Sequence, residues 1–353
     1  MITRVIDLPV FFRVGQGLLE QVGSIITEEH FVFHRVLIIS GPGSTSAVAQ
    51  LVLESLTKAN ACVVGLLSVE DNSIETVNSI KKRITDLGSD LLVGVGGGKV
   101  LDTGKLAAYE KRIPFLALPT ALSNDGIASP ISVIKFPQGV QSIGSRIPLG
   151  IIVDTEIVSR APVRLTSAGV GDLLSNLSAS EDWRLAARHG RDKVDTFADM
   201  LARSASERFL YLTEVRDGGQ RGSAEFITAL AEGLIASGLA MAIAGTSRPC
   251  SGAEHLISHA LDQLLPKPFP HGVQVAIATL WVNCLRGNDW QTLRKVFKDL
   301  GMATTPEELG ITQEQFFQAI IDAPHTRPGR FTILDLHKDK REWLKVYEKV
   351  YCQ

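Results

Sequence analysis

Residues 90–105 read Asp-Leu-Leu-Val-Gly-Val-Gly-Gly-Gly-Lys-Val-Leu-Asp-Thr-Gly-Lys, and the fold follows from this stretch. The apolar run up to Val95 predicts a strand, Gly96 to Gly98 predict a turn, and a helical pattern follows. Because glycine has no Cβ, such a turn lets the backbone approach a ligand. The N–H groups at the start of the next helix favour an anion such as a pyrophosphate. The spacing fits neither common phosphate-binding motif, so an ordinary turn remains an alternative.

The first part of the chain alternates short apolar runs with helical patterns, which indicates a mostly parallel sheet covered on both faces. Ligands bind such sheets at the carboxyl ends of the strands, where residues 96–99 and 119–125 lie. Either Ser44 or Thr45 is the expected N-cap of the helix after the first of these strands. We predict strands at 36–40, 62–67, 91–95 and 115–118, a helix over 73–87, and two further strands, 131–136 and 149–154, joined as a hairpin.

From about Pro162 the strand-like runs stop and long helical patterns follow. The predicted fold class is therefore α/β plus all-α. A doubly wound, mostly parallel nucleotide-binding domain would span 1–160 and a helical domain 161–353. A site is expected in the crevice between them. The predicted helices are 173–189, 193–213, 224–245, 252–265, 291–300, 314–321 and 340–351.

Composition excludes several classes of function. The net charge of −2 gives no bulk attraction to nucleic acid or to a membrane surface. We find no apolar run long enough to span a bilayer, and Met1 to Asp7 lack the apolar core of a signal peptide. The four scattered cysteines fit a reducing compartment. The sequence therefore predicts a cytoplasmic protein without a nucleic-acid partner and without membrane insertion.

Three positions in the helical part could hold a metal ion. Gly171-Asp172 would place a carboxylate at the start of a helix, His255 and His259 lie four residues apart on one helix face, and His271 lies in a loop or at a helix start. A carboxylate with two imidazoles suits a catalytic divalent ion because it leaves positions open for substrate. On spacing alone a metal site is the less favoured interpretation, because a histidine pair on a helix face is often a surface or core pair and Asp172 could be only a cap.

Taken together, these segments resemble the metal-dependent dehydrogenase family that includes glycerol dehydrogenases, glycerol-1-phosphate dehydrogenases and iron-containing alcohol dehydrogenases. Dehydroquinate synthase shares the fold. The ordered match of five segments is more specific than any one of them. The segments are Gly96-Gly97-Gly98-Lys99 with Asp102, residues 119–134, Gly171-Asp172, Glu254-His255 with His259, and His271-Gly272.

Within this family the likeness to glycerol-1-phosphate dehydrogenases is strongest, in residues 123–130, 251–259 and 330–334. This resemblance implies that Asp172, His255 and His271 hold the metal. It also implies that Asp125, Asp172 and His259 face the substrate as catalytic residues. The cofactor-binding residues that it implies are Gly96, Gly97, Gly98, Lys99, Val100, Leu101, Asp102, Thr120, Ala121, Leu122, Ser123 and Ser129.

The resemblance further implies reversible hydride transfer between NADH or NADPH and dihydroxyacetone phosphate, giving sn-glycerol 1-phosphate for glycerophospholipid-type metabolism. The divalent ion, expected to be zinc, would polarise the carbonyl as a Lewis acid. His259 or a water on the ion would relay the proton because an imidazole titrates near neutral pH. A homo-oligomer is expected. The substrate phosphate needs cationic donors, and the candidates are His325, Arg327, Arg330, Lys135, Arg146 and Lys267.

Two alternative functions stay open at this point. A glycerol or other polyol dehydrogenase of the same fold is the nearer one, and a cyclase of the dehydroquinate synthase type is the farther one. The cyclases carry a glutamate where Asp172 stands, which favours the dehydrogenase branch. A cofactor-binding sensor without activity fits less well because the expected ligands are all present.

Cofactor choice also stays open. The first predicted strand ends in Ser40-Gly41-Pro42-Gly43 without an acid that would repel a 2′-phosphate. That resembles family members that accept NADP as well as NAD. A plain turn, with the ribose partner elsewhere, explains the same residues equally well.

Overall fold

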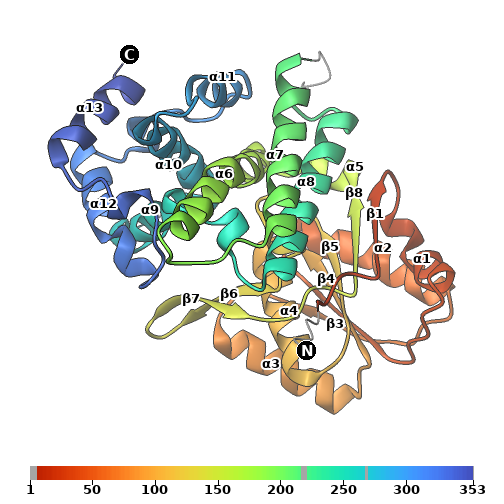
Figure 1. Cartoon of the computed structure of the whole chain (residues 1–353). Helices are drawn as coiled ribbons and strands as arrows, with labels where there is room; N and C mark the ends of the chain where they lie inside the picture. The colour runs from red at the N-terminus through yellow and green to blue at the C-terminus, as the bar shows by residue number, and fades with distance from the viewer. Residues whose placement is uncertain (1–5, 216–220, 267–268, 353) are drawn as a thin grey trace. The chain divides into compact units, whose positions relative to one another are not determined.

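A computed structural model describes residues 6–215, 221–266 and 269–352. The chain divides into two compact units, Met1–Pro162 and Val163–Gln353. Each unit is described by itself below, with the element labels of Figure 1. The predicted order, a parallel sheet followed by helices, is confirmed.

The first unit is built on a six-stranded sheet in the order β1-β8-β5-β4-β2-β3, and every neighbouring pair is parallel. The inner strands β2, β4, β5 and β8 are buried along their whole length, so both faces need apolar side chains. This is why they read as continuous apolar runs. The strands are β1 (Phe11–Gly15), β2 (Val36–Ser40), β3 (Val63–Ser68), β4 (Leu91–Gly96), β5 (Phe115–Pro119) and β8 (Gly150–Asp154).

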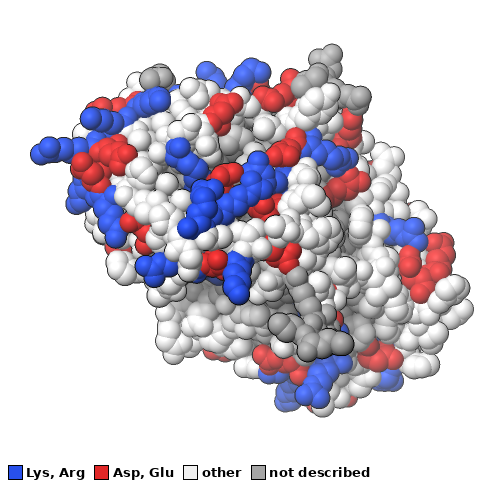
Figure 2. Space-filling view, in the orientation of Figure 1, with Lys and Arg blue, Asp and Glu red and all other residues white. Residues whose placement is uncertain are grey.

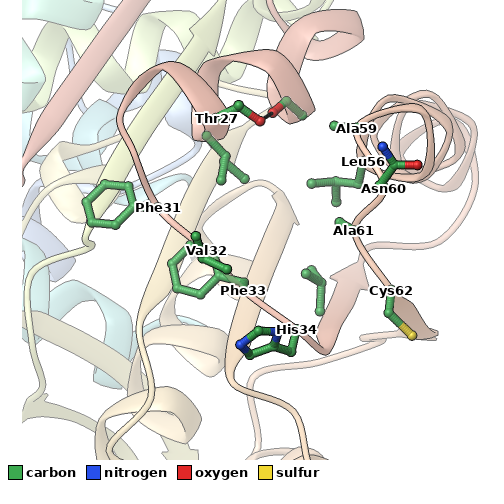
Figure 3. Close-up of a pocket in the computed structure, with 13 residues that line it drawn as sticks. Thr27, Phe31, Val32, Phe33, His34, Leu56, Ala59, Asn60, Ala61 and Cys62 are labelled. Atoms are coloured by element: carbon green, nitrogen blue, oxygen red, sulfur yellow. Dashed lines mark hydrogen bonds between the residues drawn. The ribbon is translucent and has the colours of Figure 1, made fainter.

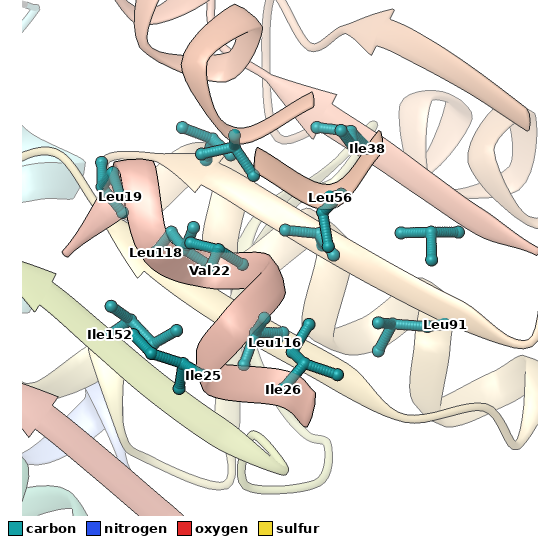
Figure 4. Close-up of a cluster of buried hydrophobic side chains, with 14 of the residues drawn as sticks. Leu19, Val22, Ile25, Ile26, Ile38, Leu56, Leu91, Leu116, Leu118 and Ile152 are labelled. Carbon is teal, nitrogen blue, oxygen red and sulfur yellow. The ribbon is translucent and has the colours of Figure 1, made fainter. Parts of the chain in front are cut away.

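Helices pack on this sheet and close its core. Figure 4 shows Leu19 of η1 (Leu19–Gln21) and Val22 and Ile25 of α1 (Val22–Glu28). These side chains pack against Leu116 and Ile152 of the sheet. The prediction of Ser44 or Thr45 as an N-cap is wrong, because α2 begins at Ser44 itself and no side chain caps it. The helices are η1 (Leu19–Gln21), α1 (Val22–Glu28), α2 (Ser44–Lys58), α3 (Ile74–Leu87), α4 (Gly98–Lys111), η2 (Asp125–Ile127) and α5 (Thr155–Ser159).

The predicted hairpin is paired differently from the expectation. β6 (Ile131–Phe136) pairs antiparallel with β7 (Gly139–Gly144), whereas β8 joins the parallel sheet between β1 and β5. The sequence did not reveal β7 because five of its six residues are exposed, which leaves no apolar run to recognise. The error was to pair residues 131–136 with 149–154.

The second unit is helical, and two of its helices, α6 and α12, are clearly longer than the sequence patterns suggested. α6 begins at Val163 rather than near Leu173, and α10 was predicted only at its start. α10 is buried on nearly every side, which removes the amphipathic period that reveals a helix. The helices are α6 (Val163–Arg188), α7 (Thr196–Val215), α8 (Ala224–Ala244), η4 (Arg248–Cys250), α9 (Ala253–Leu264), α10 (His271–Arg286), α11 (Gln291–Asp299), η5 (Glu307–Leu309), α12 (Gln313–Thr326), η6 (Ile333–Asp335) and α13 (Lys340–Tyr351).

Helix α8 contradicts the expectation that no apolar segment is long enough to span a bilayer. α8 is long and apolar enough, by length and composition, to cross a membrane. However, 72% of its most apolar window is buried within the protein, as in the core helix of a soluble protein. On the face drawn in Figure 2, Lys and Arg side chains are interspersed with Asp and Glu side chains, in line with the net charge of −2.

Candidate metal centre and cofactor turn

Two glycines bring α6 and α10 into backbone contact. A Cβ on Gly171 of α6 would lie 2.1 Å from the carbonyl oxygen of Gly272, and a Cβ on Gly272 would lie 1.9 Å from the carbonyl oxygen of Ala168. Real Cβ atoms essentially never approach other atoms below 3.0 Å, so only glycine fits at either position. The crossing places Asp172 on α6 close to His271, the first residue of α10.

Asp172, His255 and His271 form one cluster whose candidate ligand atoms all lie within 4.8 Å of one another. Asp172 and His255 are buried, and Nε2 of His255 lies 3.4 Å from Oδ1 of Asp172. The expected start of a helix at Asp172 is wrong, since this residue lies well inside α6. A helix interior fixes a carboxylate more firmly than a frayed helix end does.

Two residues to which the sequence analysis assigned no role orient the imidazoles. Glu254 is fully buried, and its Oε1 lies 2.9 Å from Nδ1 of His255, while the hydroxyl of Ser178 donates to its Oε2 at 2.9 Å. Oγ of Ser258 lies 3.0 Å from Nδ1 of His271. These contacts use Nδ1 of each imidazole, so Nε2 is the nitrogen that an ion would take, the usual arrangement around a metal. The i, i+4 spacing of Glu254 and Ser258 beside the histidines was the available sequence signal.

The charges in the cluster favour a cation. Burial alone would lower the pKa of His255, but the hydrogen-bonded carboxylates of Asp172 and Glu254 outweigh it and raise that pKa to about 9. Burial and the charge of His255 lower the pKa of His271 to about 4, so His271 is neutral, as a ligand nitrogen must be. The carboxylates of Asp172 and Glu254 therefore stabilise a positive charge at this position. A bound divalent ion can provide that charge. The donor set of one oxygen and two nitrogens fits a catalytic divalent metal.

His259 lies against the same cluster. Its ring stacks on that of His271 with centroids 5.2 Å apart, and the ring centroid of His255 is 6.4 Å away. Burial, together with the charges of the neighbouring histidines, lowers the pKa of His259 well below the ordinary value. The expectation that His259 titrates near neutral pH is therefore not supported. A second group of possible ligand atoms, from His259, Asp262 and His271, shares His271 with the first.

The glycine turn of the first unit connects β4 to α4. Gly96 ends the strand, Gly97 precedes the helix with a φ of −80°, and Gly98 begins it. A Cβ on Gly96 would lie 2.5 Å from Val100, so local packing explains this glycine. A Cβ on Gly97 would have no atom of the described residues within 4 Å. Neither the backbone conformation nor contacts with the described residues require a glycine at position 97, so its open side is available for close approach of a ligand.

Asp102 and Lys105 support the neighbouring loop. Nζ of Lys105 is fully buried and lies 3.1 Å from Oδ1 of Asp102. It donates to the carbonyl oxygens of Gly126 at 2.7 Å, Ser129 at 3.2 Å and Ile131 at 2.6 Å. Burial raises the pKa of Asp102. The structure thus places Asp102, a predicted cofactor residue, in a contact that fixes this loop.

The remaining predicted cofactor residues gather at the carboxyl ends of β4 and β5. The backbone N–H of Thr120 donates to the carbonyl oxygen of Gly96 at 3.1 Å, which ties the two strand ends together. Asp125 begins η2 and is half-buried, and the hydroxyl of Ser129 donates to the carbonyl oxygen of Ile131 at 3.3 Å. Lys99, Val100 and Leu101 lie in the first turn of α4, and Ala121, Leu122 and Ser123 follow Thr120.

Gly41 lies next to the glycine turn. It directly follows β2, and a Cβ placed on it would be 3.6 Å from Cγ2 of Val100 and 3.4 Å from Oγ1 of Thr45. Both distances leave room for a side chain. A residue at position 41 therefore reaches the region where the sequence predicts the cofactor.

A separate pocket of about 340 Å³ lies near the amino ends of β2 and β3. Figure 3 shows the segment from Phe31 to His34 on one side of it and the segment from Leu56 to Cys62 on the other. Parallel sheets bind ligands at the opposite, carboxyl ends of their strands. None of the predicted site residues lines this pocket.

Comparison with known proteins gives consistent results. Residues 13–162 match the sequence model of the family described as iron-containing alcohol dehydrogenase. A glycerol-1-phosphate dehydrogenase (NAD(P)+) of Methanobrevibacter smithii is 37% identical over 95% of this chain and 94% of its own. The enzyme of the same name from Methanothermobacter thermautotrophicus is 37% identical over 94% of this chain and 93% of its own.

Among solved structures, a probable glycerol dehydrogenase from Sinorhizobium meliloti matches with a TM-score of 0.78. The match covers 99% of this chain and 100% of that one at 21% identity, and at that identity it shows the fold alone. The 37% identity to the two glycerol-1-phosphate dehydrogenases, over nearly the whole chain, identifies the family within this fold. The chain belongs to the glycerol-1-phosphate dehydrogenase family and has the fold of the iron-containing alcohol dehydrogenases.

Proposed function

We propose that this chain is an NAD(P)-dependent sn-glycerol-1-phosphate dehydrogenase that interconverts dihydroxyacetone phosphate and sn-glycerol 1-phosphate for glycerophospholipid-type metabolism. Its similarity to relatives of that name over nearly the whole chain supports the activity. The observation that carries the chemistry is the buried cluster of Asp172, His255 and His271. An alcohol dehydrogenase of this kind needs a cation beside the reacting oxygen, and this cluster has the charge and the donors to hold one.

In this proposal Asp172, His255 and His271 hold a divalent ion, which supplies Lewis-acid stabilisation of the negative charge that develops on the substrate oxygen. Glu254 and Ser258 keep the two imidazoles in their ligand orientation through the hydrogen bonds described above. His259, neutral and stacked against His271, offers a hydrogen bond to the substrate. Asp125 is proposed to hold a substrate hydroxyl, as the family resemblance implies.

The reduced cofactor supplies the hydride, and the carboxyl ends of β4 and β5 are its proposed site. The open side of Gly97 admits a pyrophosphate against the backbone at the start of α4. Lys105 donates three hydrogen bonds to backbone carbonyl oxygens of the loop that contains Asp125 and Ser129, and these bonds fix the loop in position. Gly41, without an acidic side chain, leaves room for the 2′-phosphate of NADP.

Zinc is the proposed ion. One carboxylate oxygen and two imidazole nitrogens with open coordination positions are a donor set typical of catalytic zinc. Imidazole and carboxylate also bind Fe²⁺, so the ligands alone do not separate the two metals. Elemental analysis of protein purified without added metal, combined with activity after reconstitution with each ion, distinguishes them.

We also propose a soluble, cytoplasmic homo-oligomer. None of the four cysteines is in a disulfide, and the apolar helix α8 is mostly buried. α7 exposes three large apolar side chains, Phe197, Met200 and Tyr211, and exposed apolar surface is a feature of association interfaces. Light scattering at several protein concentrations tests the oligomer.

The decisive experiment compares dihydroxyacetone phosphate, dihydroxyacetone and glycerol with both cofactors, following the absorbance of the reduced nicotinamide. The phosphorylated ketone should be preferred over dihydroxyacetone by orders of magnitude in kcat/KM. The product should resist oxidation by an enzyme specific for sn-glycerol 3-phosphate. Equal rates with the unphosphorylated ketone would instead indicate a glycerol dehydrogenase, and absence of net cofactor turnover would indicate a cyclase.

A further inference from the structure

A cluster of arginines lies in the second unit, in the segment between α12 and η6. The segment is anchored at two points. Nη1 of Arg248 donates to the carbonyl oxygen of Phe331 at 2.7 Å, and the backbone N–H of Ile333 donates to Oδ1 of the buried Asp182 at 2.8 Å. These contacts hold Arg327 and Arg330, which precede them, in a fixed position.

Both of these arginines are directed at the residues before α9. Nη1 of Arg330 donates to the carbonyl oxygen of Ser251 at 2.5 Å, and its Nη2 donates to Oγ of Ser247 at 2.8 Å. Nη1 of Arg327 lies 3.4 Å from the same Oγ of Ser247. Two guanidinium groups therefore converge on one hydroxyl.

The charge of Arg330 is not compensated by a carboxylate in contact with it. Arg248, its neighbour, pairs with Asp192 at 2.8 Å, whereas the described residues offer Arg330 only the neutral oxygens of Ser247 and Ser251. Burial and the charges of Arg327 and Arg248 lower the pKa of Arg330 to about 9, although the carboxylates of Glu254 and Asp192 act to raise it. A partly buried cation among like charges is costly unless an anion binds it. A phosphate suits it because a guanidinium can donate two parallel hydrogen bonds to phosphate oxygens.

Arg327 and Arg330 lie close to the cluster of Asp172, His255 and His271. Ser251 is two residues before α9, the helix that carries His255 and His259. The charges of Arg327 and Arg330 are close enough to His259 to contribute to the lowering of its pKa, and that of Arg327 acts on His271 as well. In a phosphorylated triose the phosphate is separated from the carbonyl by a single carbon. A phosphate site beside the metal ligands is therefore where this substrate requires one.

We propose that Arg330, assisted by Arg327, binds the phosphate group of the substrate and sets the specificity for a phosphorylated triose. This inference rests on the proposed function and names the residues that carry its substrate selectivity. The other cations considered from the sequence are placed less favourably. Arg146 pairs with Asp7 at 3.0 Å on the surface, Lys135 and His325 are exposed, and Lys267 lies outside the described residues.

The test compares two substrates in metal-loaded protein. Arg330→Gln should lower kcat/KM for dihydroxyacetone phosphate about 100-fold, because a desolvated charge partner is lost. The value for dihydroxyacetone should stay within about threefold because this ketone has no phosphate. Arg330→Lys keeps the positive charge but lacks the planar guanidinium that donates two parallel hydrogen bonds. Its kcat/KM for dihydroxyacetone phosphate should lie between those of the wild type and Arg330→Gln. Arg341→Gln, on the exposed start of α13, is the control for loss of one positive charge and should change neither value.

A second measurement uses the wild-type protein and does not depend on a variant that folds. Phenylglyoxal modifies arginine side chains, and peptide mass spectrometry locates the modified residues. Inorganic phosphate should protect Arg330 and Arg327 but leave Arg341 reactive. Equal modification of Arg330 with and without phosphate would overturn the inference.

The outcomes separate the inference from the function on which it rests. A wild-type enzyme that prefers dihydroxyacetone phosphate, with a variant Arg330→Gln that keeps this preference, overturns the phosphate site and leaves the function intact. A wild-type enzyme without the preference overturns the function itself. Loss of the preference in Arg330→Gln, at unchanged metal content and melting temperature, supports both.

Discussion

Gly272→Ala tests whether the close crossing of α6 and α10 positions the metal ligands. A Cβ at position 272 would lie 1.9 Å from the carbonyl oxygen of Ala168, an atom of the α6 backbone. The lower limit for real Cβ contacts is 3.0 Å, so the two helices must separate by at least the difference of 1.1 Å. His271 begins one helix and Asp172 lies in the other, so the ligand geometry changes with the crossing.

The expected effect on stability is small, but the effect on the site is large. Overpacking costs about 1–3 kcal/mol, and alanine recovers up to ~1 kcal/mol of helix propensity relative to glycine. The melting temperature is therefore a weak measure of the effect of Gly272→Ala on the site. Metal sites, in contrast, tolerate deviations of about 0.2 Å in ligand distance. A shift of 1.1 Å exceeds this severalfold, and we expect kcat/KM to fall at least about 100-fold with weaker metal binding.

The assay measures metal content after dialysis, zinc affinity by competition with a chromophoric chelator, and kcat/KM with dihydroxyacetone phosphate. Gly233→Ala is the matched control in the same unit. Its Cβ would lie 2.5 Å from Cδ2 of Leu173, the movable end of a flexible side chain, so the ligands should stay in place. Wild-type metal affinity and activity in Gly272→Ala would refute the claim that this contact sets the site.

Four further substitutions test individual assignments. His271→Ala should abolish stoichiometric metal binding while the circular dichroism spectrum is retained, and full metal content in that variant would exclude it as a ligand. Glu254→Gln keeps all three ligands but weakens the orientation of His255, so zinc affinity should fall about 10–100-fold, whereas an unchanged chelator titration would argue against that role. Gly97→Val should raise the dissociation constant for NADH at least about tenfold by blocking the backbone, with normal metal content, and unchanged cofactor titration would move the dinucleotide site elsewhere. Gly41→Asp should lower kcat/KM for NADPH much more than for NADH by repelling the 2′-phosphate, and an equal response of both cofactors would show that position 41 does not face the ribose.

The sequence predicted the buried strands of the sheet well, and the reason is physical. A strand with both faces covered needs apolar residues at every position, so β2, β4, β5 and β8 are visible as continuous runs. Edge and hairpin strands lack this signal. β1 is buried only at Phe11, and β7 is almost wholly exposed, so neither was predicted and the hairpin was paired wrongly. Strand pairing depends on contacts between distant residues, which no local pattern contains.

The site shows the same division between local and distant information. Four-residue spacing placed His255 and His259 on one helix, and α9 carries both. Asp172 was expected at a helix start, and Gly169 and Gly171 disfavour a helix locally, yet α6 continues through all three residues. Packing between helices overrides this propensity. The neutral surroundings of Arg330 likewise arise from residues 79 and 83 positions away, which spacing cannot reveal.

Backbone freedom does not explain the glycines at positions 171, 272 and 97, since none of the three has a positive φ. At Gly171 and Gly272 the atom that excludes a Cβ belongs to the backbone of the neighbouring helix. At Gly97 no described atom excludes it. The open space beside Gly97 is where we propose that the cofactor approaches the backbone. The start of α4, with its N–H groups directed at the same space, is suited to a phosphate of that molecule. Of the three glycines, Gly97 is therefore the one at which a substitution tests the proposed cofactor site most directly.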